Sequence, residues 1–431
     1  MRRALTTIIA IMFCVVAAVS FAGGRAEVAS GEIMFGGWSA EEPANRPVIF
    51  GMLDVFRAEN PDVTIEWVGY PWGDVRQNFV LRYRNNEAPH IVQLQERWLS
   101  TFAALDAFVD LNEVIGRQEL ERLMDPGLLA FANVDGKQIA IPWTAGSVGM
   151  VANTRVLEQA GVREIPTTID DFTNALRAIK RSNPDVVPYA MATTNNASML
   201  LDFQIWLWTH GGRLFDDAGS VTVNSPQGVQ TLEYLVGLMQ EGLVERGVDR
   251  PDSRRLFAQH ETGFYFDAPL ARGFARTNSG QGEAFDQFIV AMPTPVLNQG
   301  DDPQSVAWGH LLALFKQPGQ TVTRESAQTK LLEYFSFDTR PQMAYFEATG
   351  LFPVSRDALA LPQVQNDAYV ATWTASAAFA RNDEPSMFPN SGEMTTVVGE
   401  EVQSALLGQK TPRQAIADMQ ARLEQLVADV R

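Results

Sequence analysis

The pattern of hydrophobic and polar positions near the start of the chain predicts a strand, a helix and two further strands. A strand-like segment at 32–35, apolar from Ile33 onward, ends at two glycines and Trp38, and apolar residues then recur at three- and four-residue spacing over 48–56, the period of a helix. Alternating apolar and polar residues at 63–67 and a largely apolar segment at 91–94 predict the next two strands. Parallel strands joined by right-handed helical crossovers form an open α/β sheet, which binds ligands at the carboxyl ends of its strands.

Later parts of the chain continue this alternation of strands and helices. We expect strands at 138–141 and 148–152. Thr168, Ser225 and Thr411 each occupy the N-cap position before an amphipathic helix, and a proline follows at the first helical position after Ser225 and Thr411. The pattern contains no internal repeat, low-complexity segment or linker, so we expect lobes joined by several short crossings and not separate domains in a row.

The first residues have the features of an export signal. Arg2 and Arg3 precede an uncharged, largely apolar stretch at 4–24, and small residues before Gly23 fit a cleavage site, so residues 1–22 are expected to be a signal peptide. The alternative is a retained membrane anchor, because the uncharged stretch is just long enough to span a bilayer. A lipid anchor at Cys14 is not favoured, since the residues before it are not the small ones that such sites use.

Composition excludes several classes of protein. The 431 residues are 46% hydrophobic and 20% charged, which is ordinary globular usage and neither disordered nor polytopic. Fifty-one acidic and 34 basic residues give a net charge of -17, which would repel nucleic acid and anionic lipid. The single cysteine lies in the expected signal peptide, so stability must come from packed cores without disulfides.

Seven short segments, in order along nearly the whole chain, resemble one known family. The chain is similar to the extracellular solute-binding proteins of bacterial ABC importers, in particular the sugar-binding group that includes maltodextrin-binding proteins. The segments are Phe56–Val63 (FRAENPDV), Ala88–Leu94 (APHIVQL), Val134–Pro142 (VDGKQIAIP), Val151–Gly161 (VANTRVLEQAG), Pro166–Leu176 (PTTIDDFTNAL), Met292–Pro295 (MPTP) and Thr349–Ser355 (TGLFPVS). His90 departs from the family, which usually carries Asp there, and the lipobox of many relatives is absent.

The resemblance implies an α/β periplasmic-binding-protein fold with two discontinuous lobes, a multi-strand hinge and a ligand cleft between the lobes. On this basis lobe one is expected at 31–145 plus 305–352 and lobe two at 146–304 plus 353–431. The expected crossings lie near 143–147, 305–308 and 351–353. The intervening cleft is the expected functional site.

A neutral sugar presents C–H faces and hydroxyl edges, so its receptor needs flat aromatic rings and groups that donate and accept hydrogen bonds. Trp38 and Trp72 follow predicted strands, and Trp143 and Trp308 lie at the expected crossings, whereas Trp67, Trp206 and Trp208 are expected to be packing residues. The other expected ligand-binding residues are polar or give close backbone approach: Glu96, Arg97, Asn195, Asp267, Gly309 and Arg356.

Each polar candidate also has a plainer interpretation. Glu96 and Arg97 resemble the acid–arginine pair with which maltodextrin-binding relatives hold sugar hydroxyls, but they also fit the solvated start of a helix. Asp267 follows an apolar strand and fits a turn cap as well as a ligand contact. Arg356 either reaches the cleft or forms an ion pair on the surface.

Catalysis is the competing class of function. The four histidines are widely separated without a zinc-binding pattern, and no phosphate loop, nucleophile elbow or dinucleotide fingerprint is present. Glu96 and Asp267 are available as a glycosidase pair, but sequence does not give the separation of two carboxylates that such chemistry requires. We therefore expect neither an enzyme, nor a metal site, nor a cofactor.

The expected function is that of a monomeric, periplasmic substrate-binding component of an ABC transporter. It would bind a sugar or oligosaccharide between its lobes and deliver it to the transmembrane permease subunits, with no nucleic-acid partner. The alternatives are a receptor for another solute, such as a glycerol phosphate or a peptide, and a secreted glycoside-acting enzyme.

Overall fold

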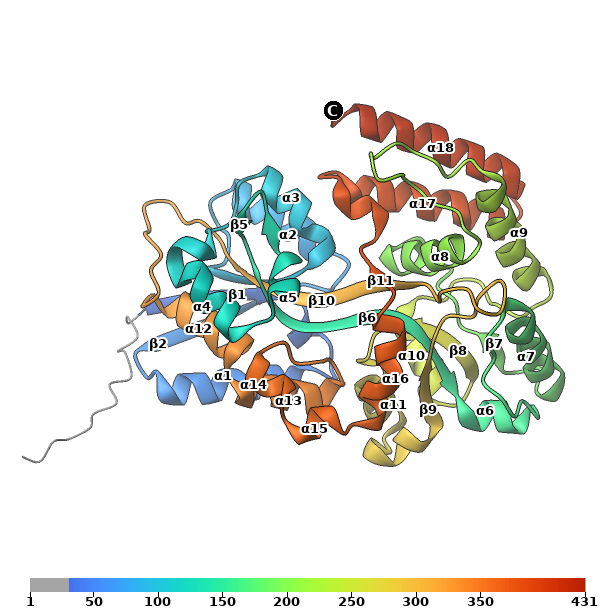
Figure 1. Ribbon diagram of the computed structural model, residues 1–431, viewed down its shortest axis with the longest axis horizontal. Coiled ribbons are helices and arrows are strands. Elements are labelled where there is room, and N and C mark those ends of the chain that lie inside the picture. The colour runs from blue at the N-terminus through green and yellow to red at the C-terminus, as the bar shows by residue number, and fades with distance from the viewer. Residues whose placement is uncertain (1–30, 431) are drawn as a thin grey trace, which may run out of the picture.

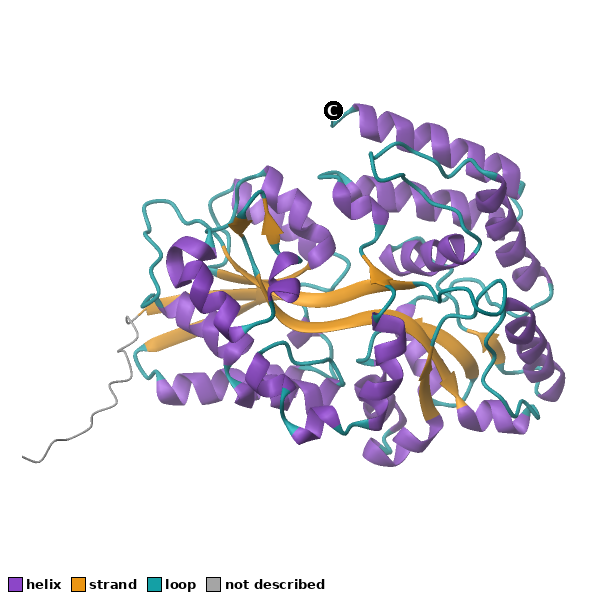
Figure 2. Cartoon of the chain, in the orientation of Figure 1, coloured by secondary structure: helices purple, strands orange, loops and turns teal. Residues whose placement is uncertain are grey.

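Two long antiparallel strands, β6 (Ile141–Asn153) and β10 (Ser305–Leu314), run from one half of the molecule into the other (Figure 1). The computed structural model describes residues 31–430, so the expected signal peptide at 1–22 lies outside the described residues. The strands join in one mixed sheet of order β2-β1-β3-β10-β6-β8-β7, with helices packed around each half (Figure 2). This arrangement confirms the α/β fold with two lobes.

The first lobe is built on the predicted strand–helix–strand unit. Strand β1 (Gly31–Gly37) pairs in parallel with β2 (Val63–Gly69) on one side and β3 (Ile91–Gln95) on the other, with β3 also pairing antiparallel to β10. The helices of this lobe are α1 (Arg46–Glu59), α2 (Val75–Arg84), α3 (Leu99–Ala104), α4 (Arg117–Leu123), α5 (Pro126–Ala130), α12 (Ala327–Phe337) and α13 (Thr339–Thr349), and a small hairpin joins β4 (Asn133–Val134) to β5 (Lys137–Gln138).

The second lobe carries the other end of the sheet. Its strands are β7 (Val187–Tyr189), β8 (Thr262–Asp267), β9 (Ile289–Met292) and β11 (Ala380–Arg381), which pairs with the start of β10. Its helices are α6 (Thr154–Gln159), α7 (Ile169–Ser182), α8 (Ala197–Thr209), α9 (Pro226–Gln240), α10 (Arg250–Ala258), α11 (Ala271–Ser279), α16 (Ala368–Ala377), α17 (Ser391–Leu406) and α18 (Pro412–Ala428). None of the helices described between residues 31 and 430 has the length and apolar character needed to cross a membrane.

The predicted helix starts are confirmed. The side chain of Thr168 accepts a hydrogen bond from the backbone N–H of Asp171, and Ser225 caps α9 in the same way. Thr411 and Gln414 form a reciprocal capping box at the start of α18. Each cap satisfies N–H groups that have no partner within the helix, which is why local sequence locates these boundaries.

The strands expected at 138–141 and 148–152 are divided differently in the structure. Gln138 ends β5, whereas Ile141 begins β6, which continues through Pro142 without a break and contains the whole of 148–152. A proline removes a ladder hydrogen bond, and the structure accommodates it with a register shift between His310 and Leu311 of the partner strand β10.

The segment after Phe352 stays with the first lobe before it crosses. Ala145 and Phe352 exchange backbone hydrogen bonds of 3.0 and 3.1 Å at the hinge. Val354 is buried in the first-lobe core, and α14 (Arg356–Leu359) contacts α13, with α15 (Pro362–Gln365) next along the chain. Helix α16 then packs on β6 and β9 of the second lobe. The chain thus packs on the first lobe through α14 and on the second lobe from α16, whereas the boundary expected from the sequence lay between residues 352 and 353.

Candidate functional site

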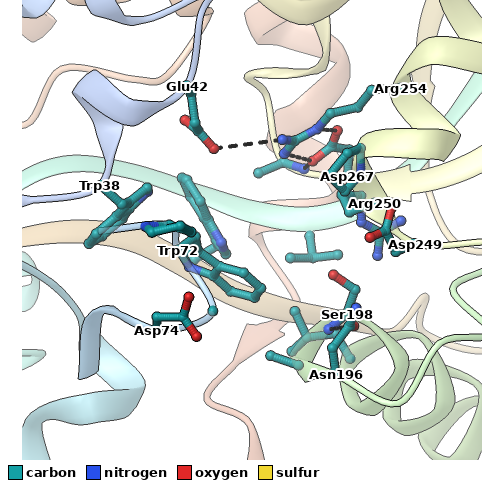
Figure 3. Close-up of a pocket in the computed structure, with 18 of the residues that line it drawn as sticks. Trp38, Glu42, Trp72, Asp74, Asn196, Ser198, Asp249, Arg250, Arg254 and Asp267 are labelled. Carbon is teal, nitrogen blue, oxygen red and sulfur yellow. Dashed lines mark hydrogen bonds and ion pairs between the residues drawn. The ribbon is translucent and has the colours of Figure 1, made fainter. Parts of the chain in front are cut away.

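A cavity of about 1150 Å³ lies between the two lobes. The first lobe contributes segments that follow β1, β2 and β3 at their carboxyl ends, which are adjacent because these strands are parallel. The second lobe contributes the first turns of α8, α10 and α17 and the segment after β8. Figure 3 shows side chains from both lobes pointing into this space.

The first-lobe wall is rich in indole rings. Trp38 packs edge-on against Trp98, with ring centroids 5.3 Å apart, and against His310, at 4.7 Å. Trp72 follows β2, and Trp308 projects from β10; both are half-buried and line the cavity. These rings give the cavity flat apolar surfaces of the kind that stack on C–H faces.

An ion-pair chain runs along one side of the cavity. Arg254 of α10 donates from Nε and Nη2 to the two carboxylate oxygens of Asp267, at 2.8 and 3.0 Å, and its guanidinium lies 3.9 Å from the ring centre of Phe274. Its Nη1 atom is 3.8 Å from Oε1 of Glu42, which belongs to the first lobe (Figure 3). This series of ion pairs therefore links the two lobes electrostatically.

Burial alters the acidity of Glu42. Desolvation raises the pKa of its carboxyl to about 7, although Arg254 and the hydrogen bond from Asn45 act in the opposite direction. The charge on this side chain therefore changes within the physiological pH range.

Arg250 is held behind the same wall. It donates from Nη2 to Oδ1 of Asp202 at 2.5 Å and from Nη1 to the carbonyl oxygen of Phe266. Asp202 also accepts a hydrogen bond from the backbone N–H of Ala192, at 2.9 Å. Because both charges are buried and paired, this pair fixes the start of α10 and leaves little donor capacity for a ligand.

The opposite side of the cavity has charges with fewer partners. Arg97 lies after β3, and its Nε atom is 3.6 Å from Oδ2 of Asp383 in the second lobe. Arg76 of α2 donates from Nη1 to Oγ of Ser391, the first residue of α17, at 3.0 Å. Burial raises the pKa of Asp383, mainly by desolvation and against the attraction of Arg97.

The cavity brings together six of the ten residues that the sequence singled out. Trp38, Trp72, Arg97, Asn195, Asp267 and Trp308 line it. Asn195 donates a long hydrogen bond of 3.4 Å to the carbonyl oxygen of Thr396, and its neighbour Asn196 caps α8 by accepting from Ser198 and Met199. Residues that follow strand ends therefore line the cavity, as expected, whereas their contact with a ligand stays a prediction.

Trp143 is a correction to the expected site. Its side chain is only 1% exposed and stacks on Tyr345 of α13, with ring centroids 4.6 Å apart and planes at 25°. Phe335 of α12 packs edge-on against it at 5.3 Å. Trp143 faces the helices that cover the sheet and belongs to the first-lobe core, because alternate residues of a strand point to opposite faces.

Three other expected residues lie outside the cavity lining. Glu96 accepts a hydrogen bond from the backbone N–H of Gly309 at 3.2 Å, and neither residue is among those that line the cavity. A side chain at position 309 would meet the carbonyl oxygen of Thr144, so Gly309 serves the close approach of β10 to β6. Arg356 is exposed, and its Nη2 atom is 3.9 Å from Oδ2 of Asp125. It therefore forms the ion pair on the surface and does not reach the cavity.

Several residues of the wall were missed by the sequence analysis. Glu42, Asp74 and Trp98 follow strand ends, so the signal that selected Trp38 and Trp72 applied to them as well. Arg254 and Ser391 come from helices far along the chain, where no local pattern marks them as cavity residues.

Two α/β lobes joined by strands that cross between them, with a ligand-sized cavity at the strand ends, define a two-lobed binding protein. The sequence profile of the bacterial extracellular solute-binding proteins matches residues 51–372, more than half of the chain. The chain belongs to this family, which confirms the resemblance seen in its sequence.

Among related sequences, a protein of Brucella abortus named as a binding protein is 22% identical over 381 residues, which cover 86% of this chain and 88% of that protein. The melibiose/raffinose/stachyose-binding protein MelE of Bacillus subtilis is 24% identical over 69% of this chain and 68% of its own length.

Two solved structures have the same fold. Maltose-bound MalE3 of T. maritima matches with a TM-score of 0.80 and 22% identity over 92% of this chain and 99% of that chain. The GacH receptor of Streptomyces glaucescens, solved unliganded and with acarbose, matches with a TM-score of 0.81 and 19% identity over 94% and 100%.

Proposed function

We propose that this protein is the substrate-binding component of an ABC importer and captures a sugar or oligosaccharide between its lobes. The observation that carries the proposal is the composition of the cavity wall, where Trp38, Trp72, Trp98 and Trp308 stand opposite polar side chains of the second lobe. Indole faces cover the C–H faces of a sugar ring, and the polar groups bond its hydroxyl edge. The names of MelE and of the maltose-bound structure support the same ligand class.

Binding and lobe closure are coupled in this proposal. A ligand stabilises the closed arrangement only to the extent that it contacts both lobes there more favourably than in the open one. The cavity supplies such contacts, because Trp72 and Arg97 come from the first lobe and Asn195 and Asp267 from the second. The strands β6 and β10 provide the hinge for this movement.

The arrangement favours a receptor over an enzyme. Of the two carboxylates considered for glycoside hydrolysis, Asp267 is engaged by Arg254, and Glu96 accepts from the backbone behind the wall. Neither is placed as a free acid or base facing the cavity, so we propose that the ligand is bound and released without covalent change. Neither a metal nor a cofactor is required for this task.

The proposed setting is the periplasm, with the expected export signal at 1–22 directing the chain there. The closed protein, acting as a monomer, then presents its ligand to the permease subunits. Family membership supports this location, since the family is extracellular.

Calorimetric titration with a panel of mono- and oligosaccharides tests the function. We expect saturable heat with one or a few saccharides, unchanged ligand recovered afterwards, and a smaller radius of gyration on binding. A ligand that co-purifies with the protein, identified by mass spectrometry, would name the sugar. Turnover of a glycoside, or binding of peptides in preference to every saccharide, would contradict the proposal.

A further inference from the structure

Two arginines lie on the side of the cavity near α17. Arg76 and Arg97 both reach it from the first lobe, and burial lowers the pKa of Arg76, with the nearby charge of Arg97 acting in the same direction. Arg97 is only 6% exposed, and its ion-pair partner Asp383 lies at 3.6 Å, beyond hydrogen-bond distance. Within residues 31–430, none of the three guanidinium nitrogens of Arg97 has a hydrogen-bond acceptor. A buried group with five N–H donors is thus left without an acceptor for any of them.

The second contribution comes from the N-terminus of α17. Arg76 lies directly against its first turn, donating to Ser391, and Gly392 leaves room for the guanidinium because a Cβ atom there would overlap it. The N-cap residue Asn390 makes no side-chain capping bond. A helix N-terminus carries a partial positive charge, so the placement of a cation there is unfavourable unless an anion is also present.

The carboxylates near this corner leave the donors of Arg97 unused. Asp383 is the buried carboxylate between the two arginines: its Oδ1 atom accepts from the backbone N–H of Ser386, and its Oδ2 atom, 3.6 Å from Nε of Arg97, has no hydrogen-bond partner among the described residues. Glu96 also attracts Arg97, but its carboxylate accepts from the backbone N–H of Gly309. Glu393 also acts on Arg76, but it is exposed to solvent, which screens its charge.

The arginines on the other side of the cavity, by contrast, donate hydrogen bonds to carboxylates of the protein itself. Arg254 makes two hydrogen bonds to Asp267, and Arg250 bonds Asp202. Those guanidinium groups are structural, with their carboxylates supplied by the protein. Arg97 has only the 3.6 Å ion pair with Asp383 and, among the described residues, no hydrogen-bonded carboxylate, which identifies the α17 corner, and not the α10 corner, as the place where a ligand supplies acceptors.

We propose that the corner formed by Arg76, Arg97 and the first turn of α17 binds an anionic substituent of the ligand. This inference rests on the proposed function and deepens it: the preferred ligand is an acidic saccharide, carrying a carboxylate, sulfate or phosphate group. Guanidinium groups bind such anions through paired, charge-assisted hydrogen bonds, and helix N–H groups add further donors. The indole rings of the same cavity then cover the sugar ring.

The test compares matched pairs of ligands by calorimetry at low salt. Glucuronate and galacturonate, as monomers and short oligomers, are set against the corresponding neutral sugars, and sugar sulfates and sugar phosphates form further arms. We expect at least a tenfold preference for one class of acidic saccharide over its neutral counterpart, decreasing as salt is raised. The arm with the highest affinity identifies the anionic group.

Variants locate the preference. Arg97→Gln and Arg76→Gln should each reduce it at least fivefold, while Arg97→Lys should retain part of it, because the charge remains but the planar fork is lost. Arg84→Gln removes the same charge from the exposed end of α2, outside the cavity lining, and should leave the preference unchanged. A melting temperature for each variant shows that it is folded.

The outcomes separate this inference from the function it rests on. Saturable binding of neutral saccharides with no gain from an acidic group would overturn the anionic corner and leave the sugar receptor intact. A preference for acidic saccharides that survives unchanged in Arg97→Gln and Arg76→Gln would also overturn the anionic corner and leave the sugar receptor intact. Binding of inorganic sulfate or phosphate as tight as that of any saccharide would instead overturn the sugar-binding proposal while supporting the corner.

Discussion

Glu42 and Arg254 face each other across the cavity, with 3.8 Å between Oε1 of the first-lobe carboxylate and Nη1 of the second-lobe guanidinium. Arg254 is held in place by two hydrogen bonds to Asp267, so the approach of Glu42 adds a contact that exists only when the lobes are close together. This pair links the charge of one side chain to the closure of the cleft.

The first prediction concerns the pH dependence of that link. Burial raises the pKa of Glu42 to about 7, so its carboxylate is charged at about pH 8 and largely protonated at about pH 6. Glu42→Gln should weaken ligand binding roughly two- to fivefold at the higher pH, the range of a partly exposed ion pair, and have little effect at the lower pH. Calorimetry at both pH values measures this, with Glu66→Gln on the exposed face of β2 as the control. An equal loss at both pH values would show that the charge of Glu42 is not the cause.

The second prediction separates two tryptophans that the sequence treated alike. Trp308→Ala should weaken saccharide binding by more than about 1 kcal/mol, because the half-buried ring lines the cavity. Trp143→Ala should instead lower the free energy of unfolding by about 3–5 kcal/mol, since it empties a buried site beside Tyr345. Titration and denaturant unfolding of both variants distinguish the two roles. Unchanged affinity in Trp308→Ala would remove this ring from the binding surface.

The third prediction concerns the buried carboxyl of Glu96. Desolvation raises its pKa from an ordinary value near 4.5 to about 7 in the folded protein, against the attraction of Arg97. A raised pKa means that the folded state binds the proton more tightly, so the contribution of Glu96 to stability is largest below about pH 4.5 and is lost as the pH rises to about 7. Glu96→Gln should therefore show a smaller fall in the free energy of unfolding over this interval than the wild-type protein, by on the order of 1 kcal/mol or more. Parallel pH slopes for the two proteins would contradict the assignment.

The fourth prediction concerns Glu384, the anchor of the segment that leads into α17. Its two carboxylate oxygens accept hydrogen bonds from Trp208 and Arg213, at 2.9 and 2.8 Å, and from the backbone N–H groups of Leu214 and Phe215. Glu384→Ala leaves these buried donors unpaired and should lower the free energy of unfolding by about 3–5 kcal/mol. Asp217→Asn, which removes only the exposed partner of Arg213, should cost less than about 1 kcal/mol. Similar losses in the two variants would show that Glu384 is not the anchor.

Local sequence determined much of the scaffold. The helix caps at Thr168, Ser225 and Thr411 are where the pattern placed them, because an N-cap depends on residues within one turn of it. The parallel pairing of β1 with β2 and β3 also follows from the strand–helix–strand order. Since parallel strands end at one edge, the order of elements alone brought Trp38, Trp72 and Arg97 to the cavity wall.

Tertiary structure decided which face each side chain of the hinge strands occupies. Trp143 and Trp308 lie on neighbouring antiparallel strands, yet one packs in the first-lobe core and the other lines the cavity. The register between β6 and β10, with its shift after His310, sets this difference, and a displacement of one residue would reverse it.

Tertiary structure also assembled the charged groups of the site. Arg254 meets Glu42, and Arg76 meets Ser391, only because the lobes bring α10 and α17 against segments that lie hundreds of residues earlier in the chain. The sequence by itself thus determined most of the α/β elements, the capped helix starts and the sheet edge that lines the cavity, all of which depend on near neighbours. The partners of each charge depend on long-range packing, which no local pattern encodes, and only the folded chain decided them.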